Sequence, residues 1–501
     1  ASRTGSERAI ASRVLAGTRP PDAYVPDPHR WRTLAVLSVV LFMSLIDVSI
    51  VNVALPSIQL GLGATDSQLQ WVLSGYALTF GVGLVTAGRA GDIYGRAPLF
   101  VVGVALFTAS SAAAGLAHDA TLLNVARALQ GVGSGLISPQ VVGMVQQYFR
   151  GAERARAFAI FGAAVGVSVA VGPLLGGLLI AAGGPLHGWR WTFFVNVPVG
   201  VVAVVLALLW FPRPLLNRNQ PGVGQGRGED RHLDPVGAVL LGLAVLALLL
   251  PFVEGRQATA LWLAVPIGAA LVGVWLWWER REKRRGRRPM VDLGIFRVRS
   301  FANGALLITV YFVGITSVWV LVAMYLQDGL GRTALETGLM GLPSAVLSAF
   351  SALLAGRNVI RHGRKVVIVG MYSALFGLLT SIVVVWLRSR GLASEWWLLL
   401  TLSFLGIGQG SVISPNQTLT LADVPLEYAG SSGGIMQTGQ RIGTSVGIAV
   451  ITAVAFTTLA RSDWSVAFMT GFAAIVLVVA CSLAIAYADL RERRLRPSGL
   501  R

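Results

Sequence analysis

Apolar runs of similar length recur along the chain and are separated by short polar or charged segments. Roughly fourteen of these runs reach the ~20 residues that an α-helix needs to cross the ~30 Å hydrocarbon core of a bilayer. They predict helical spans at 34–55, 69–86, 99–116, 122–145, 157–182, 193–211, 236–253, 260–278, 302–326, 335–355, 366–387, 396–418, 431–455 and 464–486. We therefore expect an all-α integral membrane protein.

Two sequence landmarks occur twice in the same order, which indicates an internal repeat. "GRAGDIYGRAP" and "GRNVIRHGRKV" are offset by 268 residues, and the glycines of "GVGSGLISP" and "GIGQGSVISP" are offset by 275. We expect two parallel six-helix bundles at 33–212 and 300–489, an insert at 213–299 that holds two extra helices, and tails at 1–32 and 490–501. Transporters built from such repeats hold their substrate between the halves near the midplane.

The net charge of +18 is informative mainly through the distribution of Lys and Arg along the chain. If the amino terminus is cytoplasmic, 33 of the 41 Lys and Arg residues fall on inner segments and 6 on outer loops. This is the positive-inside pattern, so we expect both termini in the cytoplasm and no nucleic-acid partner. The basic cluster after Trp278 either sets topology alone or binds anionic lipid headgroups. The first 32 residues lack an apolar core and a cleavage site, so we do not expect a signal peptide.

Asp47 is the charged residue of an apolar run, 34–55, that contains no other charge. The helical rise places it ~10 Å from the outer edge of the bilayer core, and places Arg127 and Tyr76 at ~8 and ~10 Å on helices of opposite direction. An isolated carboxylate there costs ~2.5–3.5 kcal/mol, so Asp47 needs a polar interior and a partner. Burial favours the neutral carboxyl, and a nearby arginine favours the carboxylate. If water alternately enters and leaves the cavity, the balance between these effects changes, and we expect Asp47 to bind and release a proton. The alternative is a permanent structural pair with Arg127.

Arg441 is a second buried cation, and the same rise places it ~15 Å deep, at the midplane. Two buried cations and only one buried acid argue against a transporter that exports organic cations alone. They are compatible with anionic, zwitterionic or lipid-like substrates. The alternative is that Arg441 caps carbonyls or contacts a neighbouring helix. Gln130 and Ser134 continue the polar face of Arg127, and simple helix contact is an equal alternative for them. The expected substrate cavity comprises Trp71, Tyr76, Gln130, Ser134, Gln437 and Arg441.

Two glycine-containing segments have expected structural roles. In "GRAGDIYGRAP", Gly88 and Gly95 allow close approach, Asp92 is placed to cap the positive end of a nearby helix, and Arg96 is placed to pair with an acid. Ile360 stands where the second copy would carry the acid.

In "GPLLGG", Pro173 frees the carbonyl of Val169 and bends the helix, and Gly172, Gly176 and Gly177 permit close packing.

Five motifs in order resemble the fourteen-helix drug:proton antiporter branch of the major facilitator superfamily: "LIDVSIVNVALPSI", "GRAGDIYGRAPLF", "ARALQGVGSG", "GPLLGG" and "GWRWTFFVNVPVG". The resemblance implies two six-helix bundles plus two inserted helices, and export of amphipathic small molecules by proton antiport across a bacterial cytoplasmic membrane. It also implies proton coupling at Asp47 and Arg127, a conformational latch at residues 88–96, and an antiporter motif at 172–177. Ala97 stands where the family usually has a second basic residue. The alternative substrate is a lipid, a lipid-linked metabolite or an anionic metabolite.

Other classes of protein have weak support. "GSSGG" and "GTSVG" match a nucleophile motif but lie in or beside an expected helix, and no G-x-x-x-x-G-K-[ST] segment exists to hold ATP. We therefore expect no enzyme activity, no cofactor and no metal, and a proton gradient as the energy source. A transporter-like sensor without turnover is a third hypothesis. We expect a monomer whose partners are its substrate, protons and membrane lipids.

Overall fold

The computed structural model describes residues 27–212, 233–254, 259–287 and 289–495, which form helices and connecting loops with no strand among them. The predicted tails therefore lie largely outside the described residues. The amino-terminal half contains α2 (Arg30–Leu62), α3 (Asp66–Tyr94), α4 (Arg96–Leu116), α5 (Ala120–Tyr148), α6 (Gly151–Phe194) and α7 (Asn196–Trp210). The insert contains α8 (Pro235–Glu254), the 3-10 turn η1 (Thr259–Leu263), α9 (Ala264–Arg284) and the turn η2 (Leu293–Arg297).

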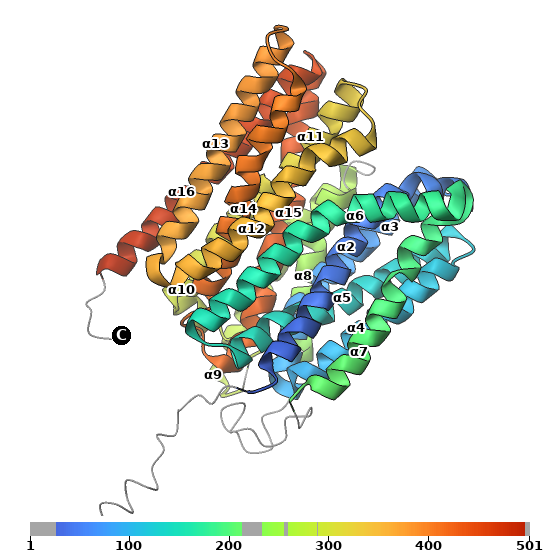
Figure 1. Ribbon diagram of the computed structural model, residues 1–501. Coiled ribbons are helices and arrows are strands. Elements are labelled where there is room, and N and C mark those ends of the chain that lie inside the picture. Colours follow the sequence, from blue (N-terminus) through green and yellow to red (C-terminus); the bar gives the residue numbers. More distant parts are fainter. Residues whose placement is uncertain (1–26, 213–232, 255–258, 288, 496–501) are drawn as a thin grey trace, which may run out of the picture.

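The carboxy-terminal half repeats this arrangement. It contains α10 (Arg299–Ile315), α11 (Ser317–Met324), the π-turn η3 (Tyr325–Gly329), α12 (Ala334–His362), α13 (Arg364–Ser389), η4 (Glu395–Trp397), α14 (Leu398–Thr420), η5 (Leu426–Tyr428), α15 (Ala429–Leu459) and α16 (Trp464–Leu495). Figure 1 shows the halves as two helical bundles side by side. The all-α membrane fold predicted from the sequence is confirmed.

The number of spans is close to the expected fourteen. Twelve helices of the described residues are long and apolar enough to cross a membrane, or thirteen when the bent α6 is counted as one span. The predicted fourth span, α5, is absent from that set because Arg127, Gln130 and Gln140 lower its hydropathy. The helices also run beyond the predicted apolar runs: α2 begins at Arg30 and ends at Leu62.

Two features interrupt α6. The segments Gly151–Ser168 and Val171–Gly184 are bent relative to each other by 42°. Gly184 then has φ +77°, a conformation that glycine adopts without the steric cost of a Cβ. The chain resumes as a helix that continues into α7, and Leu186–Trp210 together form the next apolar span.

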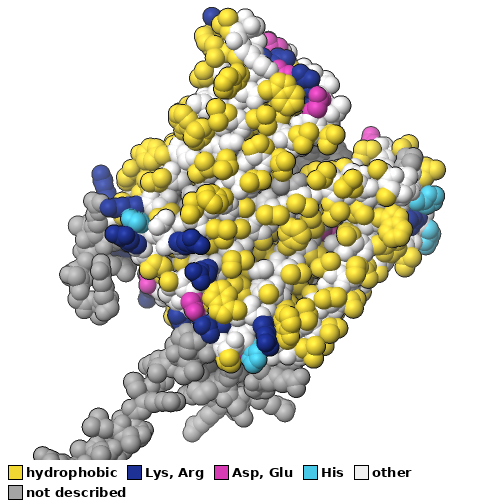
Figure 2. All heavy atoms as spheres, viewed as in Figure 1, with side chains coloured by type: hydrophobic (Ala, Val, Ile, Leu, Met, Phe, Trp, Pro, Cys, Tyr) yellow, Lys and Arg dark blue, Asp and Glu magenta, His cyan; other side chains and the backbone are white. Residues whose placement is uncertain are grey.

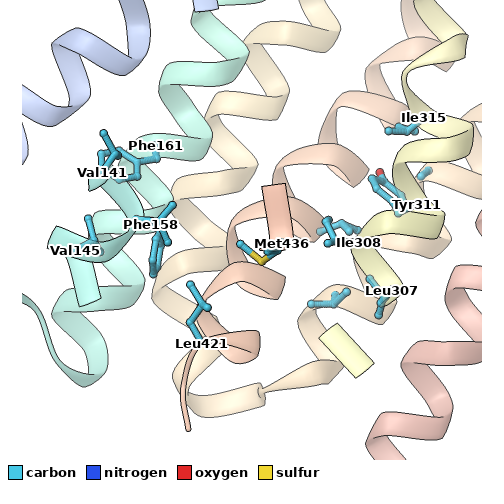
Figure 3. Packing of buried hydrophobic residues seen from close by; sticks show 14 of the residues in the cluster. Val141, Val145, Phe158, Phe161, Leu307, Ile308, Tyr311, Ile315, Leu421 and Met436 are labelled. Atoms are coloured by element: carbon cyan, nitrogen blue, oxygen red, sulfur yellow. The ribbon is translucent and has the colours of Figure 1, made fainter. Parts of the chain in front are cut away.

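The core is continuous between the halves at one end of the molecule. Figure 3 shows Val145 and Phe158 of the first half near Leu421 and Met436 of the second. Apolar side chains cover most of the visible surface, while most Lys and Arg side chains in that view lie toward its lower end (Figure 2). A protein with this surface suits a lipid solvent with charged groups held at its edges.

The inserted helices lie against both halves. Leu241, Val245 and Leu249 of α8 share a buried cluster with Leu78 and Val85 of α3. Partly buried Ile435 and Ile442 of α15 pack against the same cluster. The insert therefore covers the boundary between α3 and α15.

Candidate functional site

Asp47 lies at the centre of a buried polar network contributed by several helices. Its Oδ2 accepts a hydrogen bond from the Arg127 guanidinium at 2.7 Å, in an ion pair whose side chains are 0% and 1% exposed. Its Oδ1 accepts from Gln130 Nε2 at 2.9 Å and from Asn196 Nδ2 at 2.7 Å. A buried carboxylate that is both paired and hydrogen-bonded avoids the desolvation cost of an isolated charge.

Arg127 is held by groups other than the carboxylate. Its Nε donates to the Val72 carbonyl at 3.0 Å, and its NH1 also donates to Gln130 Oε1 at 2.6 Å. The guanidinium carbon lies 4.4 Å from the centre of the Tyr76 ring, and the Tyr76 hydroxyl is 2.8 Å from Ser134 Oγ. These contacts fix the arginine in place, so a change in the charge of Asp47 would not release it from α3 and α5.

A cavity of about 300 Å³ lies next to this network, between the halves. Helices of the first half contribute Ser44 and Val48 on α2 and Tyr76 on α3, and helices of the second contribute Gln417 on α14 and Arg441 on α15. Asp47 does not line the cavity, although Ser44 and Val48 on either side of it do. Tyr76 therefore belongs to both places, because it lines the cavity and stacks on Arg127.

Some of the residues expected to line the cavity do so, and others lie elsewhere. Tyr76, Gln437 and Arg441 line the cavity. Gln130 and Ser134 do not line it, because they lie behind Tyr76 and hydrogen-bond within the buried network.

The placement of Trp71 was wrong. Its side chain is 40% exposed and does not line the cavity, because the residues of α3 that face the interior are Val72 and Tyr76 instead.

The segment that follows α3 contacts the opposite half. The Asp92 carboxylate accepts hydrogen bonds from the backbone nitrogens of Gly430 and Ser431, both at 2.8 Å, and from Ser431 Oγ at 2.7 Å. These are the first residues of α15, so Asp92 caps the positive end of that helix. Arg96 donates to Asp92 Oδ1 at 2.7 Å and to the Leu426 carbonyl at 2.8 Å.

The halves meet most closely at this end, which we call the closed end. A Cβ at Gly88 would collide with the Gly430 carbonyl, so the two backbones need glycine at both positions. Further hydrogen bonds cross here from Gln146 to the Ala429 carbonyl at 3.2 Å, and from Arg154 to the Leu421 carbonyl at 3.5 Å.

Gly95 lies between the end of α3 and the start of α4 and has φ +107°.

The second copy of the segment has different partners. Arg364 Nε donates to Asp489 of α16 at 2.6 Å, and Arg364 also bonds Asn416 of α14. Ile360, at the position of the missing acid, is 53% exposed. This arginine is therefore bound within its own half.

The glycines of the "GPLLGG" segment contribute unequally. A Cβ at Gly172 would collide with Ser49, and one at Gly176 would lie 3.4 Å from Ile50, so α6 approaches α2 closely there. A Cβ at Gly177 would meet nothing within 4 Å, so the expected close packing is wrong for that residue.

Sequence reasoning missed two members of the buried network. Asn196 is the first residue of α7, and Ser111 of α4 accepts a hydrogen bond from Gln130 at 2.7 Å. Asn196 stands in "FFVNVPVG", a polar residue in an apolar run, and that signal was available in the sequence.

Comparison with known proteins places this architecture in a family. The sequence matches the Major Facilitator Superfamily over residues 37–448. It is 34% identical over 455 residues to the probable actinorhodin transporter of Streptomyces coelicolor, covering 87% of this chain and 76% of that protein. It is 34% identical over 428 residues to multidrug resistance protein Stp of Mycobacterium tuberculosis, covering 84% and 75%.

A third relative is the tetracenomycin C resistance and export protein of Streptomyces glaucescens, 30% identical over 432 residues, with 84% of this chain and 75% of that protein covered. Among solved structures, the human organic anion transporter MFSD10 superposes with a TM-score of 0.66 at 14% identity, covering 92% of this chain and 100% of that chain. The names of the three sequence relatives refer to actinorhodin transport, to multidrug resistance and to resistance to and export of tetracenomycin C.

Proposed function

The chain belongs to the major facilitator superfamily, and from this premise we propose that it exports amphipathic small molecules of the drug or antibiotic kind in exchange for protons. The membrane is the cytoplasmic membrane of a bacterium, with both termini and the closed end in the cytoplasm, as the distribution of Lys and Arg favours. Its bacterial relatives include antibiotic exporters, which supports this direction of transport.

One observation carries the proposal: a fully hydrogen-bonded buried acid lies one side chain away from a cavity between the two halves. Asp47 is 0% exposed, and Tyr76 lies between its ion pair and the cavity. When water reaches Asp47 from the outer side, protonation removes the attraction to Arg127 and leaves the hydrogen bonds from Gln130 and Asn196. Since those bonds suit a neutral carboxyl as well, the protonated site stays ordered.

The cycle couples this proton to the closed end. In the state described here the cavity is separated from the cytoplasm by the contacts of Asp92 and Arg96 with the start of α15. Proton binding from outside accompanies release of substrate, and proton loss to the cytoplasm accompanies its rebinding. Each proton that enters contributes ~2.3 kcal/mol per 100 mV of membrane potential.

Everted membrane vesicles test the proposal. Addition of a transported drug to energised vesicles should dissipate an imposed pH gradient, and Asp47→Asn should abolish that response because an amide cannot exchange the proton. Asp66→Asn is the matched control, since Asp66 is an exposed carboxylate at the start of α3. Full pH-gradient response in Asp47→Asn, or none in the wild type with a broad drug panel, would refute proton antiport through this site.

A further inference from the structure

The cavity between the halves has an unbalanced charge. Arg441 is the charged side chain among the residues that line it, and no Asp or Glu is present in that lining. Asp47, the acid nearest in sequence to lining residues, is already paired with Arg127 at 2.7 Å. The cavity therefore presents one cation whose negative partner the lining does not supply.

The contacts of Arg441 within the protein leave its charge unneutralised. Its guanidinium carbon lies 4.1 Å from the centre of the Phe80 ring, a stacking contact across the two halves. No carboxylate of the described residues forms an ion pair with it. An aromatic face attracts a guanidinium, but it leaves the in-plane N–H donors of the fork free to bind a planar acid.

Polar residues of α15 within one helical turn of Arg441 also line the cavity. Gln437, Gln440 and Thr444 lie on the same helix, four and one residues before Arg441 and three after it, and all line the cavity. Gln437 Nε2 is engaged with the Ser138 carbonyl at 3.2 Å. Gln440 and Thr444 therefore stand beside the arginine as further hydrogen-bonding groups facing the cavity.

The remaining wall is apolar and partly aromatic. Leu41, Leu45 and Val48 of α2 face the cavity together with Phe161, Phe312 and Ile413. A volume of about 300 Å³ is at the lower end of the range for sites that bind small organic molecules. The chemistry that fits is an apolar body with one acidic group at the α15 side.

We infer that this cavity binds amphipathic organic anions, in which Arg441 holds one carboxylate, sulfonate or ionised phenol and the apolar wall holds a ring-containing body. The inference rests on the proposed function and names the substrate class of the same site. A guanidinium fork can donate two parallel hydrogen bonds to two oxygens of a carboxylate or sulfonate, and it attracts a phenolate through its charge; a neutral analogue lacks the negative charge that strengthens these contacts. The acidic group belongs either to a soluble aromatic acid or to the headgroup of an anionic lipid.

The charge of the substrate has a consequence for energetics. Exchange of one proton inward for a neutral molecule outward moves one positive charge inward per cycle. Exchange of one proton for a monoanion moves the equivalent of two, so export of an anion should depend twice as steeply on membrane potential.

A matched pair of fluorescent probes tests the inference. 1-Anilinonaphthalene-8-sulfonate and N-phenyl-1-naphthylamine share one ring system and differ in the sulfonate. Binding of both is measured on the purified full-length protein in neutral-lipid nanodiscs, with empty nanodiscs subtracted. We expect Arg441→Gln to weaken binding of the sulfonate about 10- to 100-fold and binding of the amine by less than about twofold.

Two further variants keep the test independent of folding. Arg441→Lys should retain a preference for the sulfonate at reduced affinity, because the charge remains and the fork is lost. Arg461→Gln, an exposed arginine just after α15, should leave both affinities unchanged. Equal loss of both probes in Arg441→Gln, or loss of neither, would overturn the inference.

Two more measurements are needed. One distinguishes a soluble acid from a lipid headgroup as the ligand, and the other distinguishes failure of this inference from failure of the proposed proton antiport. Competition by phosphatidylglycerol nanodiscs at equal lipid concentration identifies a headgroup, whereas sulfonate binding that phosphatidylglycerol leaves unchanged identifies a soluble acid. In proteoliposomes, Asp47→Asn should still prefer the sulfonate to the amine but fail to accumulate it, while Arg441→Gln should keep proton-driven transport of the neutral amine. Failure of coupling with intact sulfonate selectivity would refute the proposed function and leave this inference standing.

Discussion

The segments that follow α3 and α12 occupy equivalent places in the two halves, yet their arginines have different partners. Arg96 binds Asp92, and Asp92 caps α15 of the opposite half. Arg364 binds Asp489 on α16 of its own half. The arginine of the first segment therefore takes part in a contact between the halves, while the arginine of the second is bound within its own half. The second segment still meets the first half through Gly356, which packs against Ala159 of α6.

The same asymmetry applies to the buried acids. Asp47 and Asp489 are both buried and both paired with arginine, but Asp47 lies beside the cavity and Asp489 lies near the end of α16. The comparison shows that both halves have an arginine after the corresponding helix, whereas the buried acid beside the cavity, Asp47, and the acid that caps α15, Asp92, both belong to the first half.

The largest expected difference comes from neutralising the two buried acids. Asp47→Asn and Asp489→Asn each leave a buried arginine without its counter-charge, which costs about 3–5 kcal/mol of stability. We expect a similar fall in melting temperature of the purified proteins. Uphill transport of substrate should be lost in Asp47→Asn alone, because only Tyr76 separates the Asp47–Arg127 pair from the cavity, whereas Asp489 pairs with Arg364 near the end of α16. Equal loss of uphill transport per folded molecule in both variants would remove the distinction between the halves.

The second test removes the cap between the halves. Asp92→Asn replaces a charged acceptor of three hydrogen bonds from α15 by a neutral one, at an expected cost of about 1.5–3 kcal/mol to the closed end. Spin labels at exposed Ala152 and Ala422, in a Cys481→Ser background, report the separation of the halves there. The long-distance population should grow about tenfold or more.

Ile360→Asp is the matched change in the second half. Because Ile360 is 53% exposed, a carboxylate there is solvated and should not alter the label distances. An unchanged distribution in Asp92→Asn, or a comparable shift in Ile360→Asp, would contradict a cap specific to the first segment.

A third test concerns the glycines at the two contacts. Gly88→Ala directs a methyl at the Gly430 carbonyl, and Gly356→Ala directs one at the Ala159 methyl. Both changes should open the closed end. Only the second is expected to be partly rescued by a compensating change, Ala159→Gly, which removes the 2.3 Å obstacle and leaves the Ala155 carbonyl at 3.0 Å. In the first pair the obstacle is backbone. Rescue is measured by the same distances between the spin labels. If Ala159→Gly does not bring the distances in Gly356→Ala back toward the wild-type values, the Ala159 methyl is not the obstacle.

The smallest effect is expected where the insert meets α15. Burial alone would raise the pKa of Asp292, but hydrogen bonds from Lys283 Nζ at 2.6 Å and from the Gly294 nitrogen outweigh it and lower that pKa. A lowered pKa adds stability above the unfolded value, and that stability is lost as pH falls through the folded value. Asp292→Asn should therefore lower the melting temperature slightly and equally at pH 8 and pH 5. A difference from wild type that vanishes already at pH 6 would contradict this assignment.

Much of the fold follows from residues that carry strong local signals. Lipid requires long apolar helices, so their approximate number and position could be predicted from the runs alone. The depth of Asp47 and Arg127 follows from a fixed rise per residue, and the structure places the two in contact. Asp92 is likewise found at a helix start, where a carboxylate is favoured.

The arrangement of helices around one another could not be predicted in the same way. Helical rise gives depth but not the face that each residue presents, so depth alone does not show that the Trp71 side chain points away from the cavity. Whether Ser134 faces the cavity or Tyr76 depends on how α3 and α5 are rotated against each other, and that is fixed by close contacts such as Gly131 with Thr79.

Proton release on substrate binding tests the central claim most directly. We propose that Asp47 loses its proton when substrate binds. In weakly buffered solution, saturating the purified protein with a transported substrate should therefore release protons, up to about one per molecule. The same titration of Asp47→Asn should give no proton signal while the substrate still binds. An undiminished proton signal in Asp47→Asn would show that another group carries the proton and would contradict the account.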